Sequence, residues 1–140
     1  MKTRMILALV LMTFSAMSWA EEDTRELVKM PEMMQQHMLG NMRNHLETIN
    51  LILSQMAKGE LDKAADTAEQ RLGMSSLDKH GASHLAKFMP QPMQDAGTQM
   101  HHAASRFALK AQEGEALPAY AALQEVTAGC VACHAGYRIR

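Results

Sequence analysis

Four segments of this chain carry apolar residues at steps of three and four, and no segment shows the sustained alternation expected of a strand. Such spacing lines one face of an α-helix with apolar side chains, so it restricts the chain to a helical fold. Pro31 suits the first turn of a helix, and Gly59, Gly73 and Gly114 are placed to end three of the segments. We therefore expect helices over about residues 31–57, 60–72, 92–112 and from about 117 toward the C-terminus.

Each expected helix has one apolar face that should point inward. In the first helix this stripe contains Met34, Met38, Met42, Leu46, Ile49, Leu53 and Met56. In the second and third helices it contains Leu61, Ala65, Ala68 and Leu72, then Met93, Ala96, Met100, Ala104, Phe107 and Ala111. In the last helix we expect Tyr120, Leu123, Thr127, Cys130, His134 and Tyr137 on the inner face.

The connections between these helices predict the fold class. The first and third connections are short, whereas residues 73–91 form a longer one that contains Gly73, Gly81, Pro90 and a Ser75-Ser76 pair. A short turn of helix within residues 77–88 fits inside it. Four amphipathic helices with this pattern of connections predict an all-α fold, an antiparallel four-helix bundle with a longer connection between helices 2 and 3.

The first twenty residues have the organisation of a secretory signal peptide. Lys2 and Arg4 precede an apolar run over residues 5–14, and Ser18 and Ala20 supply the small residues expected before a cleavage site. We therefore expect residues 1–20 to be cleaved and residues 21–140 to form one domain in the periplasm; a retained N-terminal anchor is the alternative.

The charge of the mature segment excludes some partners. Twelve basic and fifteen acidic side chains remain after residue 20, a net charge of −3, so neither nucleic acid nor an anionic membrane is an expected partner.

The two cysteines of the chain are Cys130 and Cys133, and His134 follows directly. C-x-x-C-H is the attachment sequence of c-type haem: each thiol adds across a vinyl group to form a thioether, and the histidine offers a nitrogen to the iron. A disulfide would close a very small loop and stabilise little. A thioredoxin-like pair would need a strand before its helix, and a zinc site would need further ligands. We expect one covalent haem c held by Cys130 and Cys133, with His134 as the proximal iron ligand.

The C-terminal sequence resembles that of cytochrome c′ and its low-spin relatives, which share the motif C-x-x-C-H-x-x-[YF]-R. Cys130, Cys133, His134, Tyr137 and Arg138 match this motif, and the outline of four helices extends the resemblance over residues 30–140. The resemblance implies a periplasmic monohaem protein with redox partner proteins, often a homodimer packed through helices 1 and 2. It also implies that Arg138 lies near a haem propionate or the imidazole. An alternative of equal weight is that Arg138 is a solvated basic residue at the end of a helix.

The sixth iron position divides this family by function. A methionine from the first helix gives a low-spin electron carrier, whereas an open position binds nitric oxide or carbon monoxide. We expect Met42 to be the distal ligand, with Met38 as second choice, and a one-electron carrier as the function. The alternative is a five-coordinate protein that binds a small gas, with the methionines as core packing only. His45 is a further ligand candidate, but we expect it to flank the stripe, because Leu46 fits the core position better.

The other histidines are weaker candidates. His80 and His84 could share a helix face and bind a metal, but without supporting carboxylates or cysteines we expect them to be solvated. We expect His102 to point outward, with Met100 and Ala104 facing in. No arrangement of residues typical of hydrolysis or phosphoryl transfer stands out, so we expect no enzymatic activity; a peroxidase would need an acid–base residue, for which His45 is the one candidate.

Overall fold

The computed structural model describes residues 22–140, so the expected signal peptide lies outside the described residues. Five α-helices account for most of this part of the chain, which confirms the all-α prediction. They are α1 (Glu32–Ala57), α2 (Leu61–Arg71), α3 (Ala82–Ala86), α4 (Gln91–Gln112) and α5 (Ala116–Gly136). A 3₁₀ turn, Met74–Ser76, and two short strands, β1 (Glu26–Leu27) and β2 (Tyr137–Arg138), complete the described elements.

The ends of the long helices follow the expected stop and start residues. Pro31 and Pro90 stand directly before α1 and α4, where a fixed φ suits helix entry. Gly59 and Gly114 have φ angles of 73° and 82° in the tight turns after α1 and α4, a conformation that favours glycine. The expected ranges of the four long helices therefore agree with the structure to within one or two residues, and α3 lies inside the longer connection.

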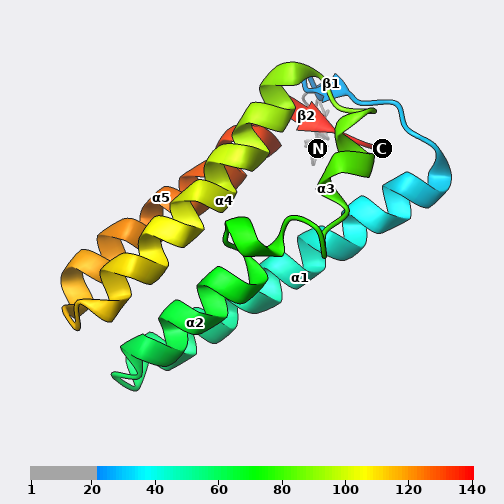
Figure 1. Cartoon of the computed structure of the whole chain (residues 1–140). Coiled ribbons are helices and arrows are strands. Elements are labelled where there is room, and N and C mark those ends of the chain that lie inside the picture. Colours follow the sequence, from blue (N-terminus) through cyan, green and yellow to red (C-terminus); the bar gives the residue numbers. More distant parts are fainter. Residues whose placement is uncertain (1–21) are drawn as a thin grey trace, which may run out of the picture.

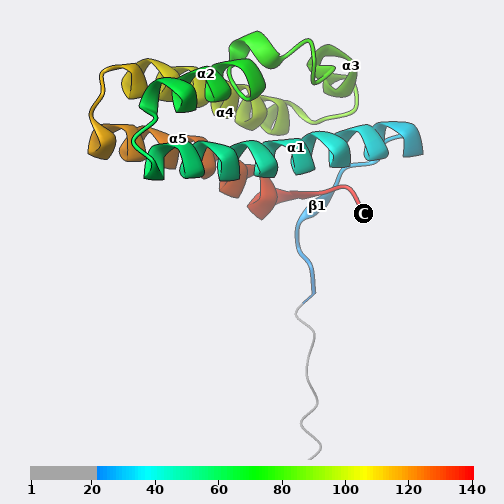
Figure 2. The same cartoon turned by 90° about the horizontal axis from the view of Figure 1, so that it is seen from below.

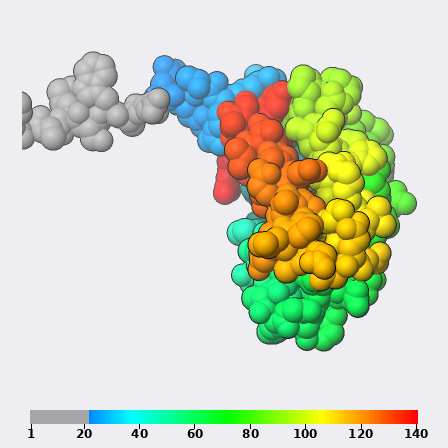
Figure 3. Space-filling model, turned by 90° about the vertical axis from the view of Figure 1, so that its left-hand side faces the viewer, coloured from blue at the N-terminus to red at the C-terminus, as the bar shows by residue number. Residues whose placement is uncertain are grey.

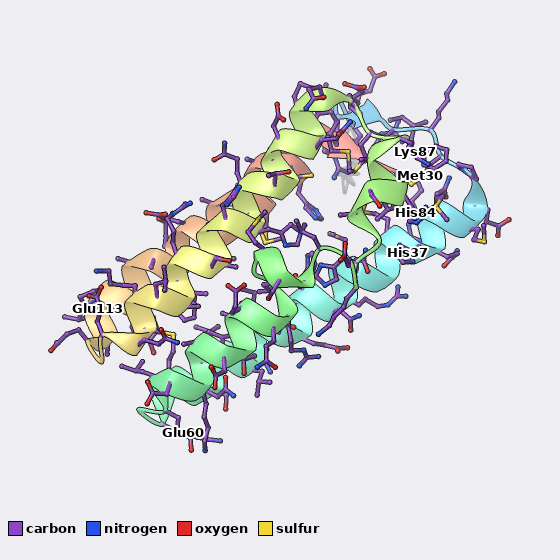
Figure 4. The ribbon with its side chains drawn as sticks, in the orientation of Figure 1. Met30, His37, Glu60, His84, Lys87 and Glu113 are labelled. Carbon is purple, nitrogen blue, oxygen red and sulfur yellow. The ribbon has the colours of Figure 1, made fainter. Side chains whose placement is uncertain are left out.

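The long helices pack in chain order. α1 packs on α2, α2 on α4, and α4 on α5. Figure 2 shows α2, α3 and α4 in one layer with α1 and α5 in the other. Glu60 and Glu113, labelled in Figure 4, mark the α1–α2 and α4–α5 turns at the end of the molecule away from the C-terminus, while α3 and the two strands lie at the opposite end (Figure 1).

The larger of two core clusters fills the end near the helical turns. Phe107, Ala104 and Ala111 of α4 are fully buried there, and Leu61, Ala65, Ala68 and Leu72 contribute the inner face expected for the second helix. The abundance of alanine lets α2, α4 and α5 approach closely. The expected inner faces of the second and third helices are confirmed in most positions.

The buried face of α1 differs from the expected one. Leu46 is 72% exposed, whereas His45 is only 9% exposed, so the expectation that Leu46 would be the core residue and His45 the flank is wrong. The buried positions of α1 are Met38, Asn41, His45, Thr48, Ile52 and Met56. The helix is turned toward polar residues because His45 meets histidines from two other segments, and Thr48 satisfies its hydroxyl on the Asn44 carbonyl (2.7 Å).

The inner face of α5 also differs. Ala119, Leu123 and Val126 are buried, whereas Tyr120 is 41% exposed and His134 is exposed. The expectation that Tyr120 and His134 face the core is therefore wrong; α5 packs against α4 through small residues, and Tyr120 is too large for that face.

A smaller core cluster lies at the end that carries the C-terminus. β1 pairs with β2 in parallel, Glu26 opposite Tyr137 and Leu27 opposite Arg138, and the Val28 amide donates to the Arg138 carbonyl (2.8 Å). Val28, Met30, Met38, Leu85 and Met93 are buried there. In Figure 3 the C-terminal segment lies beside the N-terminal one, next to α4 and α5. The segment before α1 is thus fixed directly to the residues that follow the C-x-x-C-H sequence.

None of the helices within residues 22–140 has an apolar stretch that is long enough and sufficiently free of charge to cross a bilayer.

Candidate functional site

A cavity of about 530 Å³ lies between the N-terminal half of α1, the long connection, α4 and the end of α5. This volume is within the usual range of about 300–1,000 Å³ for small-molecule and cofactor sites. Most of its surface is apolar, and its lining residues include the methionines Met38, Met42, Met89, Met93 and Met100. The site therefore has the character of a pocket for a large apolar group with a few polar side chains.

Two of the three C-x-x-C-H residues reach this cavity. Cys133 and His134 line its wall at the last turn of α5. Cys130, one turn earlier, is partly buried against the larger core cluster, and its thiol donates to the Val126 carbonyl at 3.6 Å. For both thiols to hold one haem, the Cys130 side chain has to turn from that contact toward the cavity.

Both cysteines are free thiols. Burial raises the pKa of Cys130, and burial together with the neighbouring Cys130 raises the pKa of Cys133. Burial therefore favours the protonated thiol at both positions.

Both methionine candidates for the distal ligand line the cavity. Met38 is 7% exposed and Met42 is partly buried; each lines the cavity and belongs to, or packs on, the same apolar cluster as Cys133 and Tyr137. The structure thus brings the N-terminal half of α1 and the C-terminal end of α5 to one cavity, but it does not distinguish Met42 from Met38.

The rim of the cavity is basic. Arg25, Arg138 and Arg140 line it together with the end of α5. Arg25 pairs with Asp23 (2.7 Å), and the hydrogen bonds from Arg25 lower the pKa of Asp23 to about 2. Arg138 Nε is buried and makes no hydrogen bond in the described part of the chain, although Asp23 Oδ2 lies 3.5 Å away. The Asp23 carboxylate therefore already forms a loose ion pair with this N–H, and a haem propionate would compete with it for the same group.

The chemistry of these residues fits a covalent haem. The apolar lining, the Cys133 thiol and His134 imidazole on one wall, the methionines along the cavity and the Arg138 Nε–H without a hydrogen bond are groups that such a cofactor can use. The position of Cys130 is the one feature that needs a side-chain rotation before attachment.

A cluster of three histidines was missed by the sequence analysis. His45 of α1, His80 of the long connection and His101 of α4 all line the cavity, and their nearest ring nitrogens lie within 4.8 Å of one another. His80 lies against His45 and His101, whereas His84 is exposed, so the expectation that both would be solvated is met by His84 and is wrong for the half-buried His80. His102 is exposed while Met100 and Ala104 are buried, as predicted.

The environment of the histidine cluster favours neutral imidazoles. Burial, assisted by repulsion from His80 and His101, lowers the pKa of His45 to about 3. Burial also lowers the pKa of His80 and of His101. No sequence signal could have joined these positions, because they come from three elements and share no local spacing.

Comparison of the chain with protein-family models, with curated proteins and with solved structures finds no match.

Proposed function

We propose that this chain is a periplasmic monohaem c-type cytochrome that carries single electrons. The observation that carries the proposal is the position of the C-x-x-C-H sequence: it ends α5 at the wall of an apolar, methionine-lined cavity, with Cys133 and His134 on that wall. A thiol pair with an adjacent histidine at such a cavity suits covalent attachment and axial ligation of a haem. The packing of α1 on α2, α2 on α4 and α4 on α5 is common to this structure and to the antiparallel four-helix bundle that the resemblance implies, in which α1 would also pack along α5.

Each residue of the site has a separate role in this proposal. Cys130 and Cys133 anchor the haem through thioethers, and His134 is the proximal ligand. Met42 is the distal ligand, with Met38 as second choice, since both line the cavity. Arg138 holds a propionate through its buried Nε–H. When bound, the haem supplies reversible one-electron chemistry, and the thioether of the methionine favours the ferrous state.

The surroundings of the cavity suit electron transfer better than catalysis. The methionines contribute to the apolar lining, and the arginines at the rim offer positive charge to a carboxylate-bearing group. His45, the one residue considered as a peroxidase base, is packed against two other histidines. We therefore propose that the chain is not an enzyme and that it exchanges electrons with periplasmic redox proteins.

Gas binding at an open sixth position is the second candidate function. The cavity is large and its methionines also suit plain packing, so a pocket beside a five-coordinate iron would accept nitric oxide or carbon monoxide.

The absorption spectra of the purified protein, ferric and ferrous, with and without carbon monoxide, separate the two functions. The carrier function predicts a low-spin spectrum, a weak ferric band at the red end from methionine coordination, and slow binding of the gas. A high-spin spectrum that changes promptly with carbon monoxide would replace the carrier by the gas-binding function. A purified protein without haem would contradict both the electron-transfer and the gas-binding function.

We also propose that two copies associate through α1 and α2, as the resemblance implies. α1 exposes Leu46 (72%) and Leu53 (41%), which lie seven residues apart and so on one face of the helix. Apolar side chains that a single chain leaves in water are what such a contact would bury.

A further inference from the structure

Three distant parts of the chain bring histidine side chains to one point. His45 Nε2 lies 3.4 Å from His80 Nδ1, and the ring centroids of His45, His80 and His101 are 4.7 to 5.8 Å apart. His45 and His101 are 9% and 7% exposed. Each ring has one nitrogen that lies within 4.8 Å of a nitrogen of each of the other two rings.

The orientation of His101 is fixed by its second nitrogen. Nδ1 lies 2.6 Å from the Leu72 carbonyl oxygen, and because a carbonyl only accepts, Nδ1 is the donor. The neutral ring then keeps a lone pair on Nε2 for the cluster. A backbone carbonyl that holds the outer N–H of a histidine is the usual second-shell arrangement of metal ligands.

His80 is held in place through its own backbone. Its carbonyl oxygen accepts hydrogen bonds from Asn41 Nδ2 and from His37 Nε2, both at 2.8 Å and both from α1. Gly81, with φ of 61°, turns the chain directly after it. The connection is therefore tied to α1 within two turns of His45, and the cluster is built before any ligand arrives.

The spacing of one nitrogen pair matches a shared cation. Two nitrogens that each lie about 2.1 Å from a tetrahedral zinc ion are about 3.4 Å apart. The 3.4 Å between His45 Nε2 and His80 Nδ1 equals this value and is long for an N–H···N hydrogen bond, and the third nitrogen, from His101, lies within 4.8 Å of both. Among the described residues no carboxylate joins the group, so the ligand set is purely imidazole, which suits Zn²⁺ and its neighbours rather than Mg²⁺ or Ca²⁺.

We propose that His45, His80 and His101 bind one Zn²⁺ ion, with the remaining coordination position open to the cavity that all three side chains line. The ion would tie α1, the long connection and α4 together. None of the three is a haem ligand in the proposed function, but all three line the cavity in which that function places the haem, so the zinc ion and the haem would share this cavity.

Isothermal titration of the mature, tag-free and chelator-treated protein with Zn²⁺ tests this site. One ion should bind per chain, and His101→Ala and His80→Ala should each weaken binding at least about 100-fold, more than the loss of an outer-shell partner. The matched controls are His102→Ala and His84→Ala, next to or near each ligand but exposed, which should bind as the unaltered protein does. Circular dichroism shows whether each variant folds.

X-ray absorption at the zinc edge of the unaltered protein gives an answer that needs no variant. Three nitrogen ligands from imidazole at about 2.0–2.1 Å are expected. Absence of a one-to-one site, equal weakening by the controls, or fewer than three imidazole ligands would overturn the proposal. The haem content of the same samples is measured separately, so loss of zinc binding and failure of haem attachment are distinguishable.

Discussion

At the level of single residues, the choice between electron transfer and gas binding falls on Met38 and Met42 of α1. Both line the cavity, but Met38 is the more deeply buried and Met42 lies nearer the histidine cluster in sequence. The sequence predicted both as candidates because their spacing put them on one stripe. It ranked Met42 ahead of Met38, but the structure does not separate the two, since both side chains line the same cavity.

We expect Met42→Ala to convert a low-spin spectrum to a high-spin one and to permit fast carbon monoxide binding, because the thioether ligand is lost. Met38→Ala should leave the coordination unchanged and act only on stability, by about 2–5 kcal/mol as for other buried methionines. Met33→Ala, at a residue 74% exposed, is the control. If only Met38→Ala changes the spectrum, the assignment moves to Met38; if neither does, both are wrong.

His45 makes the stability of the metal-free protein depend on pH. Its pKa is about 3 in the fold and about 6.5 when unfolded, so the unfolded chain binds more protons between these values. The contribution of neutral His45 to the free energy of unfolding is complete above pH 6.5. It is lost as the pH falls toward 3, by up to about 1.4 kcal/mol per pH unit. The lowered pKa values of His80 and His101 act in the same direction.

Urea unfolding of chelator-treated protein at pH 7.5 and pH 5 measures this effect. The free energy of unfolding should fall at pH 5, and His45→Gln should reduce that fall while exposed His102→Gln should not. An equal fall in all three proteins would show that His45 is not responsible.

At the level of elements, apolar spacing alone predicted the four long helices, because each carries a stripe bounded by proline or glycine. It placed the buried face correctly on α2 and α4, where the inner residues are apolar. It failed on α1, where Asn41, His45 and Thr48 are buried, because hydrogen bonds and contacts between histidines from other segments compensate their polarity. The parallel pairing of β1 and β2 was also missed, since two-residue strands show no periodicity.

The contact between α4 and α5 depends on Gly129. A Cβ at this position would lie 2.8 Å from Met100 Cβ and 3.2 Å from its Cα, so the two helices would have to separate. Gly129→Ala should lower the free energy of unfolding by about 1–3 kcal/mol through overpacking. The usual gain of about 0.5–1 kcal/mol from replacing a helical glycine offsets part of this loss. Gly40→Ala, with open space around it in α1, should show the gain alone. Urea unfolding compares them, and two stabilised variants would refute the close contact.

At the level of the whole molecule, the exposed apolar face of α1 is the surface through which we propose that two copies of the chain associate. We expect the mature protein to sediment as a dimer in analytical ultracentrifugation, and Leu46→Glu combined with Leu53→Glu to sediment as a monomer, because charges would enter the apolar contact. Leu109→Glu, at a residue 67% exposed on α4, should remain a dimer. A monomer before any substitution would contradict the proposed contact.

The C-x-x-C-H sequence predicts a haem from five neighbouring residues, whereas the cavity beside it could not be predicted from the sequence. The motif is local, whereas the cavity is formed by segments more than ninety residues apart in the chain, from Met38 to Cys133. The basic rim likewise depends on β1, which brings Arg25 beside the end of α5, where its Nη1 lies 3.4 Å from the His134 carbonyl.

The central claim is covalent attachment of one haem, and the intact mass of the purified mature protein under denaturing conditions tests it most directly. The mass should equal that of the chain after residue 20 plus one haem, and denaturing electrophoresis should retain the haem on the polypeptide. Cys130→Ala with Cys133→Ala should give the mass of the chain alone. Protein secreted by cells that assemble c-type cytochromes, but recovered at the mass of the bare chain with both cysteines intact, would contradict the account.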